Sequence, residues 1–135
     1  MEGCPYCEIV TDESDAHILA DTNSTVAFLD RNPATPGHTL VVPRRHCEFL
    51  FKGENPPSRS VFETVERLVE AMNSTLTPDG VSTFYTSGPL VGNVSHAHVH
   101  VIPRYEDDSI HLSLTRDRLE DDEGAELARR IRKSL

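Results

Sequence analysis

Three histidines alternate with small or apolar residues in the segment 95–103, which reads Ser-His-Ala-His-Val-His-Val-Ile-Pro. Successive side chains of a β-strand point to opposite faces, so a strand here would place His96, His98 and His100 on one face. Such a face has three interpretations: a solvated polar surface over a buried apolar one, a metal site of neutral imidazoles, or a catalytic site with a nucleophilic middle histidine. The segment alone leaves all three open.

Cys4 and Cys7 form a second group with chemical potential. The two-residue spacing of Cys-Pro-Tyr-Cys lets both sulfurs reach one tetrahedral zinc ion. A redox pair or a simple turn has the same spacing, although a redox pair is expected to open a helix in a βαβ context, which this pattern lacks. Zinc would need two further ligands, and single downstream histidines such as His46 are candidates. We interpret Cys47 as a buried thiol.

Two further features could bind parts of a nucleotide. Asp30 follows a predicted strand, where its carboxylate could accept both hydroxyls of a ribose or could cap a turn, and both interpretations stay open. The segment 87–93, Ser-Gly-Pro-Leu-Val-Gly-Asn, contains two glycines, which allow backbone N–H groups to approach a phosphate closely.

Short β-branched and apolar runs bounded by turn residues predict the strands that position these groups. The run 38–43, His-Thr-Leu-Val-Val-Pro, is expected to be buried on both faces. Between the second and third strands, two prolines and a glycine in residues 31–37 define the path of a loop. The predicted strands are 16–21, 25–30, 38–43, 81–86 and the histidine segment 95–103.

A long helix is predicted over Ser58 to Leu76, with Pro78 and Gly80 ending it. Ser60 and Glu63 have the spacing of a capping box. The apolar stripe is typical of a core face rather than a cofactor site. It consists of Val61, Val65, Leu68, Val69, Met72 and Leu76.

A second helix is predicted over Glu123 to Leu135. Leu127, Ile131 and Leu135 form a narrow apolar edge on it. Basic side chains gather towards its end, where they suit the negative pole of the helix dipole and require no nucleic acid to explain them.

Length and charge limit the number of domains and the kinds of partner that we expect. The 135 residues predict a single domain, 1–135, with a core over about 4–104 and an acidic segment and helix over 105–135. A net charge of −9 argues against salt-driven binding to DNA or RNA. The sequence shows neither a signal peptide nor an apolar run long enough to span a membrane, so we expect a cytoplasmic protein with no membrane partner.

Arginine greatly outnumbers lysine among the basic residues. The chain has eleven arginines, and its only lysines are Lys52 and Lys133. An acidic, lysine-poor surface suits a cytoplasm of concentrated salt, where screening removes self-repulsion. A GC-rich genome also favours arginine over lysine, so both explanations remain.

Taken in order, the motifs resemble the histidine-triad (HIT) superfamily of nucleotide hydrolases and transferases, in its zinc-containing small prokaryotic branch. They are Cys4-x-x-Cys7, Phe28-Leu29-Asp30, Gly37-His38-Thr39-Leu40-Val41-Val42-Pro43-x-x-His46 and His96-Ala97-His98-Val99-His100-Val101-Ile102-Pro103-Arg104. The resemblance implies an α+β fold, with one long helix packed on a five-stranded antiparallel sheet and short N-terminal and C-terminal helices. It also implies a homodimer that extends the sheet.

The resemblance implies one structural zinc per chain. Its ligands would be Cys4, Cys7, His46 and His96. Because four protein ligands fill a tetrahedral shell, such an ion would be structural and would not activate water.

The resemblance also assigns the chemistry. His98 would attack the α-phosphorus of a purine nucleotide substrate, an AMP or GMP derivative such as a nucleoside phosphoramidate. Water would then release a nucleoside monophosphate from the nucleotidyl-histidine. His100 would hydrogen-bond the bridging atom or phosphate and assist the leaving group, His38 would lie against the nucleophile and orient it, and Asp30 would bind the ribose.

This sequence departs from the family pattern in the phosphate-binding loop. Asn93 stands where a serine or threonine donor is usual and Gly92 where glutamine is usual, with the register one residue out of step. Ser87 is the nearest polar candidate for an asparagine found near the end of the preceding strand. Two other functions stay open: a dinucleoside polyphosphate hydrolase or nucleotidyltransferase, and a zinc-stabilised nucleotide sensor with vestigial activity.

Overall fold

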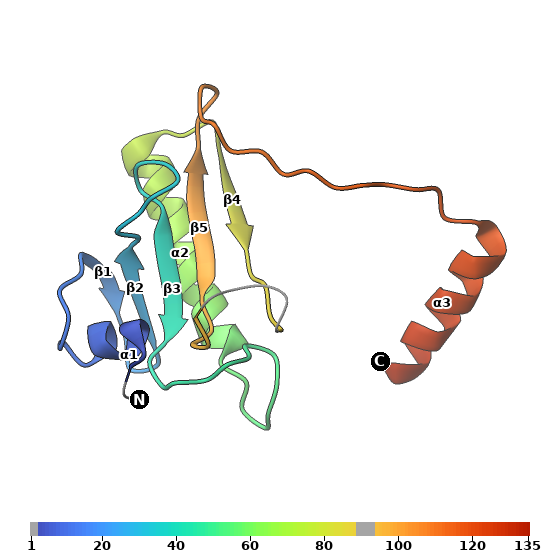
Figure 1. The fold of residues 1–135 in the computed structure, drawn as a ribbon, viewed down its shortest axis with the longest axis horizontal. Helices are drawn as coiled ribbons and strands as arrows, with labels where there is room; N and C mark the ends of the chain where they lie inside the picture. The colour runs from blue at the N-terminus through green and yellow to red at the C-terminus, as the bar shows by residue number, and fades with distance from the viewer. Residues whose placement is uncertain (1–2, 89–93) are drawn as a thin grey trace.

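The computed structural model describes residues 3–88 and 94–135. Five strands form one antiparallel sheet in the order β1-β2-β3-β5-β4, and the long helix α2 lies across one face (Figure 1). The predicted α+β fold, with its short terminal helices, is confirmed. The elements are α1 (Pro5–Val10), β1 (Ile18–Asp21), β2 (Thr25–Leu29), β3 (Thr39–Pro43), α2 (Ser58–Leu76), β4 (Gly80–Phe84), β5 (Val99–Arg104) and α3 (Asp121–Ser134).

The central strand β3 separates two apolar layers and is buried at every position, as predicted. Val41 faces α2 and packs in a cluster with Val99 and Val101 of β5. Leu40 and Val42 point to the opposite face, where a second cluster includes residues of β2 and α1. Alternation along β3 therefore places one helix on each side of the sheet.

The long helix has the predicted bounds, but its first turn differs from the prediction. Because α2 begins at Ser58, Ser60 lies inside the first turn and cannot be the N-cap of a capping box. The Ser60 hydroxyl instead donates to the carbonyl oxygen of Pro57, 3.1 Å away. At the other end Thr77 adopts a left-handed conformation and Pro78 follows.

The histidine strand is shorter than predicted. β5 begins at Val99, so His96 and His98 lie in the segment that leads into it. The ladder between β3 and β5 runs from the Thr39–Val101 pair to the Val41–Val99 pair and stops near Pro43, which has no N–H to donate. Alternation persists nevertheless, because Ala97, Val99 and Val101 all enter the cluster under α2.

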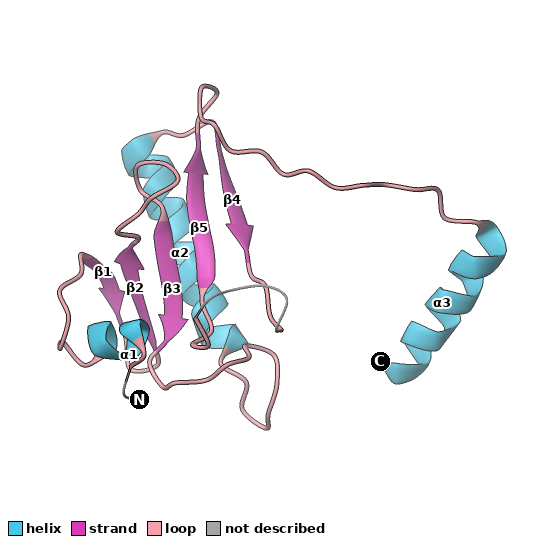
Figure 2. Ribbon diagram, viewed as in Figure 1, coloured by secondary structure: helices cyan, strands magenta, loops and turns pink. Residues whose placement is uncertain are grey.

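The chain after β5 leaves the body of the domain. Residues 109–120 have no regular secondary structure and lead to α3, which stands apart from the sheet (Figures 1 and 2). The predicted terminal helix is confirmed, with its start two residues earlier, and none of its residues is buried. In the described ranges, no helix combines the length and apolar character needed to cross a membrane.

Candidate active site and zinc centre

The ring of His98 has its tautomer set by the backbone. Its Nδ1 lies 2.9 Å from the carbonyl oxygen of His96, and because a carbonyl only accepts, Nδ1 carries the hydrogen. In the neutral ring, Nε2 is then the unprotonated nitrogen. His98 thus has the form that a nucleophile requires, with its lone pair on the nitrogen that faces away from the backbone.

His38 and His100 form a second ordered chain of hydrogen bonds. The backbone N–H of Ala34 donates to Nδ1 of His38 at 3.0 Å, so neutral His38 carries its hydrogen on Nε2. That Nε2 lies 2.9 Å from Nδ1 of His100 and donates to it. His100 in turn must carry its own hydrogen on Nε2, where it is available to a substrate.

The contact of His38 differs from the one that the resemblance implied. His38 was expected to lie against the nucleophile, but its hydrogen bond goes to His100, with the two ring centroids 5.2 Å apart. His98 takes its orientation from the His96 carbonyl instead. The centroids of His98 and His100 are 5.1 Å apart, so all three rings still belong to one site.

Burial favours the neutral forms of His38 and His100. It lowers the pKa of His100 to about 4, with further lowering by the neighbouring His98 and His38. Burial also lowers the pKa of His38, and the nearby Asp30 carboxylate opposes this only in part. Phe84 covers His100 from the edge strand, in a stacked arrangement with ring centroids 4.5 Å apart. Both histidines are therefore hydrogen-bond donors in their uncharged forms near neutral pH.

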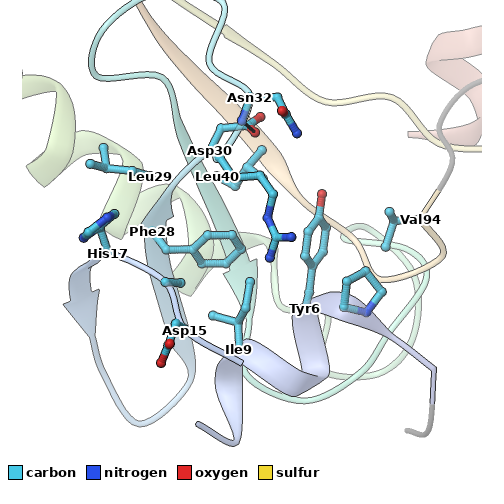
Figure 3. A pocket seen from close by; sticks show the side chains of 13 residues that line it. Tyr6, Ile9, Asp15, His17, Phe28, Leu29, Asp30, Asn32, Leu40 and Val94 are labelled. Atoms are coloured by element: carbon cyan, nitrogen blue, oxygen red, sulfur yellow. Dashed lines mark hydrogen bonds between the residues drawn. The ribbon is translucent and has the colours of Figure 1, made fainter. Parts of the chain in front are cut away.

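A cavity of about 750 Å³ lies beside the histidines, and Figure 3 shows the side chains that line it. Ile9, Phe28 and Leu40 give it an apolar wall, while Asp30 and Asn32 are polar groups at one end. The volume and the mixture of apolar and a few polar groups are typical of a small-molecule site. The sequence prediction identified Asp30 at this site but missed the apolar wall, which comes from three separate elements.

Asp30 has the turn-capping role that was one of its two predicted interpretations, and its carboxylate also lies near His38. Its Oδ1 accepts the backbone N–H of Asn32 at 2.9 Å, which is the hydrogen bond of a turn-capping aspartate. Its Oδ2 lies 3.6 Å from Nε2 of His38. The carboxylate thus joins the wall of the cavity to the histidine pair, while the turn holds it in place.

Four potential metal ligands meet in a second cluster. They are Cys4, Cys7, His46 and His96, the set that the resemblance implied. Nδ1 of His96 lies 3.6 Å from Sγ of Cys4 and 3.5 Å from Sγ of Cys7. Nδ1 of His46 lies 3.2 Å from Sγ of Cys7.

The geometry of this cluster fits zinc. With Zn–S near 2.3 Å and Zn–N near 2.0 Å, a tetrahedral ion holds its ligand atoms about 3.3–3.8 Å apart, and the three distances above are close to this range. Nε2 of His96 donates to the carbonyl oxygen of Pro43 at 2.7 Å, which leaves the Nδ1 lone pair directed at the cysteines. Cys4, Cys7 and His96 are buried, as expected of a structural rather than a catalytic metal site.

Tyr6 connects the cysteine motif to the cavity. It lies between the two cysteines in sequence, and its ring stands edge-on to His98 with centroids 5.1 Å apart. The same ring is 5.6 Å from Phe28 and lines the cavity. Burial and the nearby Asp30 raise the pKa of Tyr6 to about 12, so the hydroxyl stays protonated. Sequence reasoning missed this residue, although its position between two ligands could have indicated it.

The remaining predicted site residues have different outcomes. Gly92 and Asn93 lie outside the described residues. Ser87 is exposed and follows β4. Cys47 is half-buried rather than fully buried, and it packs against the core below α2.

Comparison with known proteins places the chain in a family. Residues 11–107 match the model of the HIT domain. A HIT-like protein of Methanocaldococcus jannaschii is 36% identical over 78% of this chain and 81% of its own. Adenylylsulfatase HINT3 of Arabidopsis thaliana is 31% identical over 98% of this chain and 69% of its own, and adenosine 5'-monophosphoramidase hnt1 of Schizosaccharomyces pombe is 28% identical over 75% and 74%.

Solved structures agree with this placement. A HIT-family protein from Bacillus subtilis superposes with a TM-score of 0.90 at 27% identity, covering 99% of this chain and 98% of that one. A zinc-bound histidine-triad protein from Mycobacterium smegmatis superposes with a TM-score of 0.73 at 28% identity, covering 97% of both chains. Together with the ordered histidines, these matches show that the chain belongs to the HIT domain family.

Proposed function

We propose that this protein is a nucleoside phosphoramidate or nucleotide hydrolase that works through a covalent nucleotidyl-histidine. The single observation that carries the proposal is the hydrogen bond between Nδ1 of His98 and the His96 carbonyl, which leaves Nε2 of His98 as the free nucleophilic nitrogen. The names of two relatives, an adenylylsulfatase and an adenosine 5'-monophosphoramidase, support an AMP-derived substrate. We propose a purine base for this reason.

In the first step, Nε2 of His98 would form a bond to the α-phosphorus while the bond from phosphorus to the leaving group breaks. The electron pair would leave with that group, which takes up a proton from the surrounding water as it departs. Nε2–H of His100 would hydrogen-bond the bridging atom or a phosphate oxygen as charge develops there. Because the pKa of His100 is near 4, this role is that of a neutral donor rather than of a charged acid.

In the second step, water would attack the same phosphorus and return the electron pair to Nε2 of His98. The proton from water would pass to the solvent, and a nucleoside monophosphate would leave. The His96 carbonyl would stabilise the positive charge on the His98 ring of the intermediate by accepting its Nδ1–H. Imidazole suits both steps because it is a good nucleophile and a good leaving group.

The cavity would hold the nucleoside. Phe28, Ile9 and Leu40 offer an apolar surface to the base, and Asp30 could accept the ribose hydroxyls. The phosphate would point towards His98, because Tyr6 lines the cavity and its ring centroid lies 5.1 Å from that of His98. Asn93, Gly92 and Ser87 remain proposed contacts to the phosphate.

We propose one structural zinc per chain, held by Cys4, Cys7, His46 and His96. The zinc-bound relative from Mycobacterium smegmatis supports the metal. Zinc would supply no chemistry to the phosphate, because all four positions are filled by protein. It would fix His96, whose carbonyl orients His98. We also propose that the protein acts as a cytoplasmic homodimer.

A substrate panel tests the proposal. Purified protein should release AMP from adenosine phosphoramidate faster than from dinucleoside polyphosphates or nucleotidyl sugars. Faster cleavage of a dinucleoside polyphosphate or a nucleotidyl sugar would favour the polyphosphate hydrolase or nucleotidyltransferase alternative. Tight AMP binding with no turnover of any compound would favour a nucleotide sensor.

A further inference from the structure

Residues 4–14, which we call the N-terminal segment, contribute to two sites at once. The segment carries Cys4 and Cys7 of the metal cluster. Its helix α1 also supplies Tyr6 and Ile9 to the wall of the cavity. Figure 3 shows both of these side chains extending from α1 beside Phe28 of β2. A single short helix therefore links the metal cluster to the cavity proposed for the nucleoside.

The polar contacts that join this segment to the rest of the domain all involve its two cysteines. Within the described part of the chain, the backbone of the segment hydrogen-bonds only to itself, as in the bond from the N–H of Thr11 to the carbonyl oxygen of Cys7. The same ranges show polar side-chain contacts to other elements only from Cys4 and Cys7. Their sulfurs lie between 3.2 and 3.6 Å from ring nitrogens of His46 and His96.

Apolar packing is the second attachment of the segment. Ile9 is buried in one cluster with Phe28 and Leu40, and Tyr6 packs against that cluster. A helix of six residues does not hold its shape alone, because isolated helices shorter than about 12–15 residues are marginal in water. The position of α1 therefore depends on the metal cluster and on the apolar contact together.

We propose that metal binding at the cysteine cluster sets the affinity of the cavity for its nucleotide. This inference rests on the proposed function and adds the regulation of that same site. When an ion joins the four ligands, α1 is fixed, and Tyr6 and Ile9 complete the cavity wall. Without the ion, the two thiols keep only weak S–H hydrogen bonds to the imidazoles, so the N-terminal segment separates from the sheet and that wall opens.

The dependence must be mutual. If the metal raises the affinity for the nucleotide by some factor, the nucleotide raises the affinity for the metal by the same factor, because the two bindings form one thermodynamic cycle. A base packed against Ile9 and Phe28 adds a contact that keeps the N-terminal segment in place. That contact holds Cys4 and Cys7 near the two histidines, where they can bind the ion.

This route through α1 is separate from the one through His96, whose carbonyl orients His98. Loss of that orientation would lower the rate of the chemical step, whereas loss of the cavity wall would weaken nucleotide binding itself. Binding of AMP, the product of the proposed reaction, involves no chemical step. AMP affinity therefore reports on the route through α1.

The test measures the AMP dissociation constant by isothermal titration calorimetry, for the zinc-loaded protein and for protein whose zinc a chelator has removed. A competing chelator then gives the zinc dissociation constant with and without saturating AMP. Two matched variants each shorten an apolar residue of the cavity wall, Ile9→Ala in the N-terminal segment and Leu40→Ala in β3. Amide hydrogen exchange follows residues 4–14 and β3 in both zinc states.

For the wild type, we expect zinc removal to raise the AMP dissociation constant by about tenfold or more, and saturating AMP to lower the zinc dissociation constant by the same factor. The amides of residues 4–14 should lose protection while those of β3 keep theirs. Ile9→Ala should reduce the factor to about threefold or less, because it removes the contact that links the two sites. Leu40→Ala should weaken AMP binding in both zinc states and keep the factor.

Equal AMP affinity in the two zinc states would overturn this inference alone. Loss of β3 protection on zinc removal would overturn it too, because the metal would then hold the whole domain rather than one wall. A factor that Ile9→Ala leaves unchanged would contradict the route through α1. Failure of AMP to bind the zinc-loaded wild type would overturn the proposed function as well. The wild-type measurements decide the proposal even if Leu40→Ala fails to fold.

Discussion

Nε2 of His38 lies 2.9 Å from Nδ1 of His100, and the backbone N–H of Ala34 determines the direction of this hydrogen bond. Since Ala34 donates to Nδ1 of His38, His38 must donate to His100, and His100 must present Nε2–H. Two backbone groups thus set the tautomers of the site: the Ala34 amide for this pair and the His96 carbonyl for His98. In the neutral tautomers that these contacts set, the lone pair on Nε2 of His98 lies in the same site as Nε2–H of His100.

The depressed pKa of His100 predicts a pH dependence of stability. Folded His100 has a pKa of about 4 against an ordinary 6.5, so the unfolded chain binds more protons between these values. The free energy of unfolding should therefore fall as pH drops from 6.5 towards 4. The full shift corresponds to about 3 kcal/mol, which screening in a half-exposed site reduces to about 1 kcal/mol.

Urea unfolding at pH 7 and pH 5 checks this for wild type and His100→Asn. The variant should lose about 1 kcal/mol less than wild type over this interval, whereas replacement of the exposed His17 by Asn should change nothing. NMR titration of the His100 ring provides an independent reading. A ring that becomes charged near pH 6.5 would contradict this account.

Tyr6 is expected to position the nucleophile through its ring. Tyr6→Ala removes the edge-on contact with His98, whose centroid is 5.1 Å away, and opens the cavity wall next to Phe28. The rate constant for turnover should fall about tenfold or more, because small misplacements of reacting groups are costly. Tyr6→Phe keeps the ring and should stay within about threefold of wild type. Equal losses in the two variants would assign the effect to the hydroxyl instead.

Zinc should be part of the folded protein. Metal analysis of the purified chain should give about one equivalent, as a single four-ligand site requires. Cys4→Ser should lose the metal and lower the melting temperature by about 10 °C, since each kcal/mol is worth about 2–4 °C in a chain of this size. Cys47→Ser is the matched control, because Cys47 packs against the core and is not one of the clustered ligands. Unchanged stability in Cys4→Ser would speak against a structural metal.

Local pattern predicted much of this molecule, and the long helix shows why. Its apolar residues keep the same helical spacing along all 19 residues, and α2 has the predicted bounds. Ser60 shows the limit, because a capping box depends on where the first turn starts and not on spacing alone. The strand of His100 was predicted too long for a related reason. Its start depends on Pro43 in a neighbouring strand, a contact that no local window contains.

For the site too, local sequence pattern predicted which residues take part, but not the contacts that depend on distant parts of the chain. The residues of the Cys/His cluster and the three histidines of the candidate site could be named from motifs, whereas their hydrogen-bond partners could not. The contact of His38 with His100 rather than His98 depends on the path of the loop at Ala34. The apolar wall of the cavity combines Ile9, Phe28 and Leu40 from α1, β2 and β3, so only the fold brings it together.

The acidic, lysine-poor composition predicts a response to salt. If the protein is adapted to a concentrated cytoplasm, its free energy of unfolding should rise between dilute buffer and multimolar KCl, because screening removes repulsion among surface carboxylates. Urea denaturation at several KCl concentrations measures this. Full stability in dilute buffer, with no further gain from salt, would leave genome composition as the reason for the missing lysines.

The most direct test of the central claim is capture of the covalent intermediate. The protein is incubated with adenosine phosphoramidate, quenched in mild base and measured by intact-mass spectrometry, with His98→Ala and the exposed His111→Ala in parallel. We predict an added adenylyl mass on wild type and His111→Ala, and none on His98→Ala. An adduct that persists in His98→Ala, or AMP release by wild type with no trapped adduct, would contradict nucleophilic attack by His98.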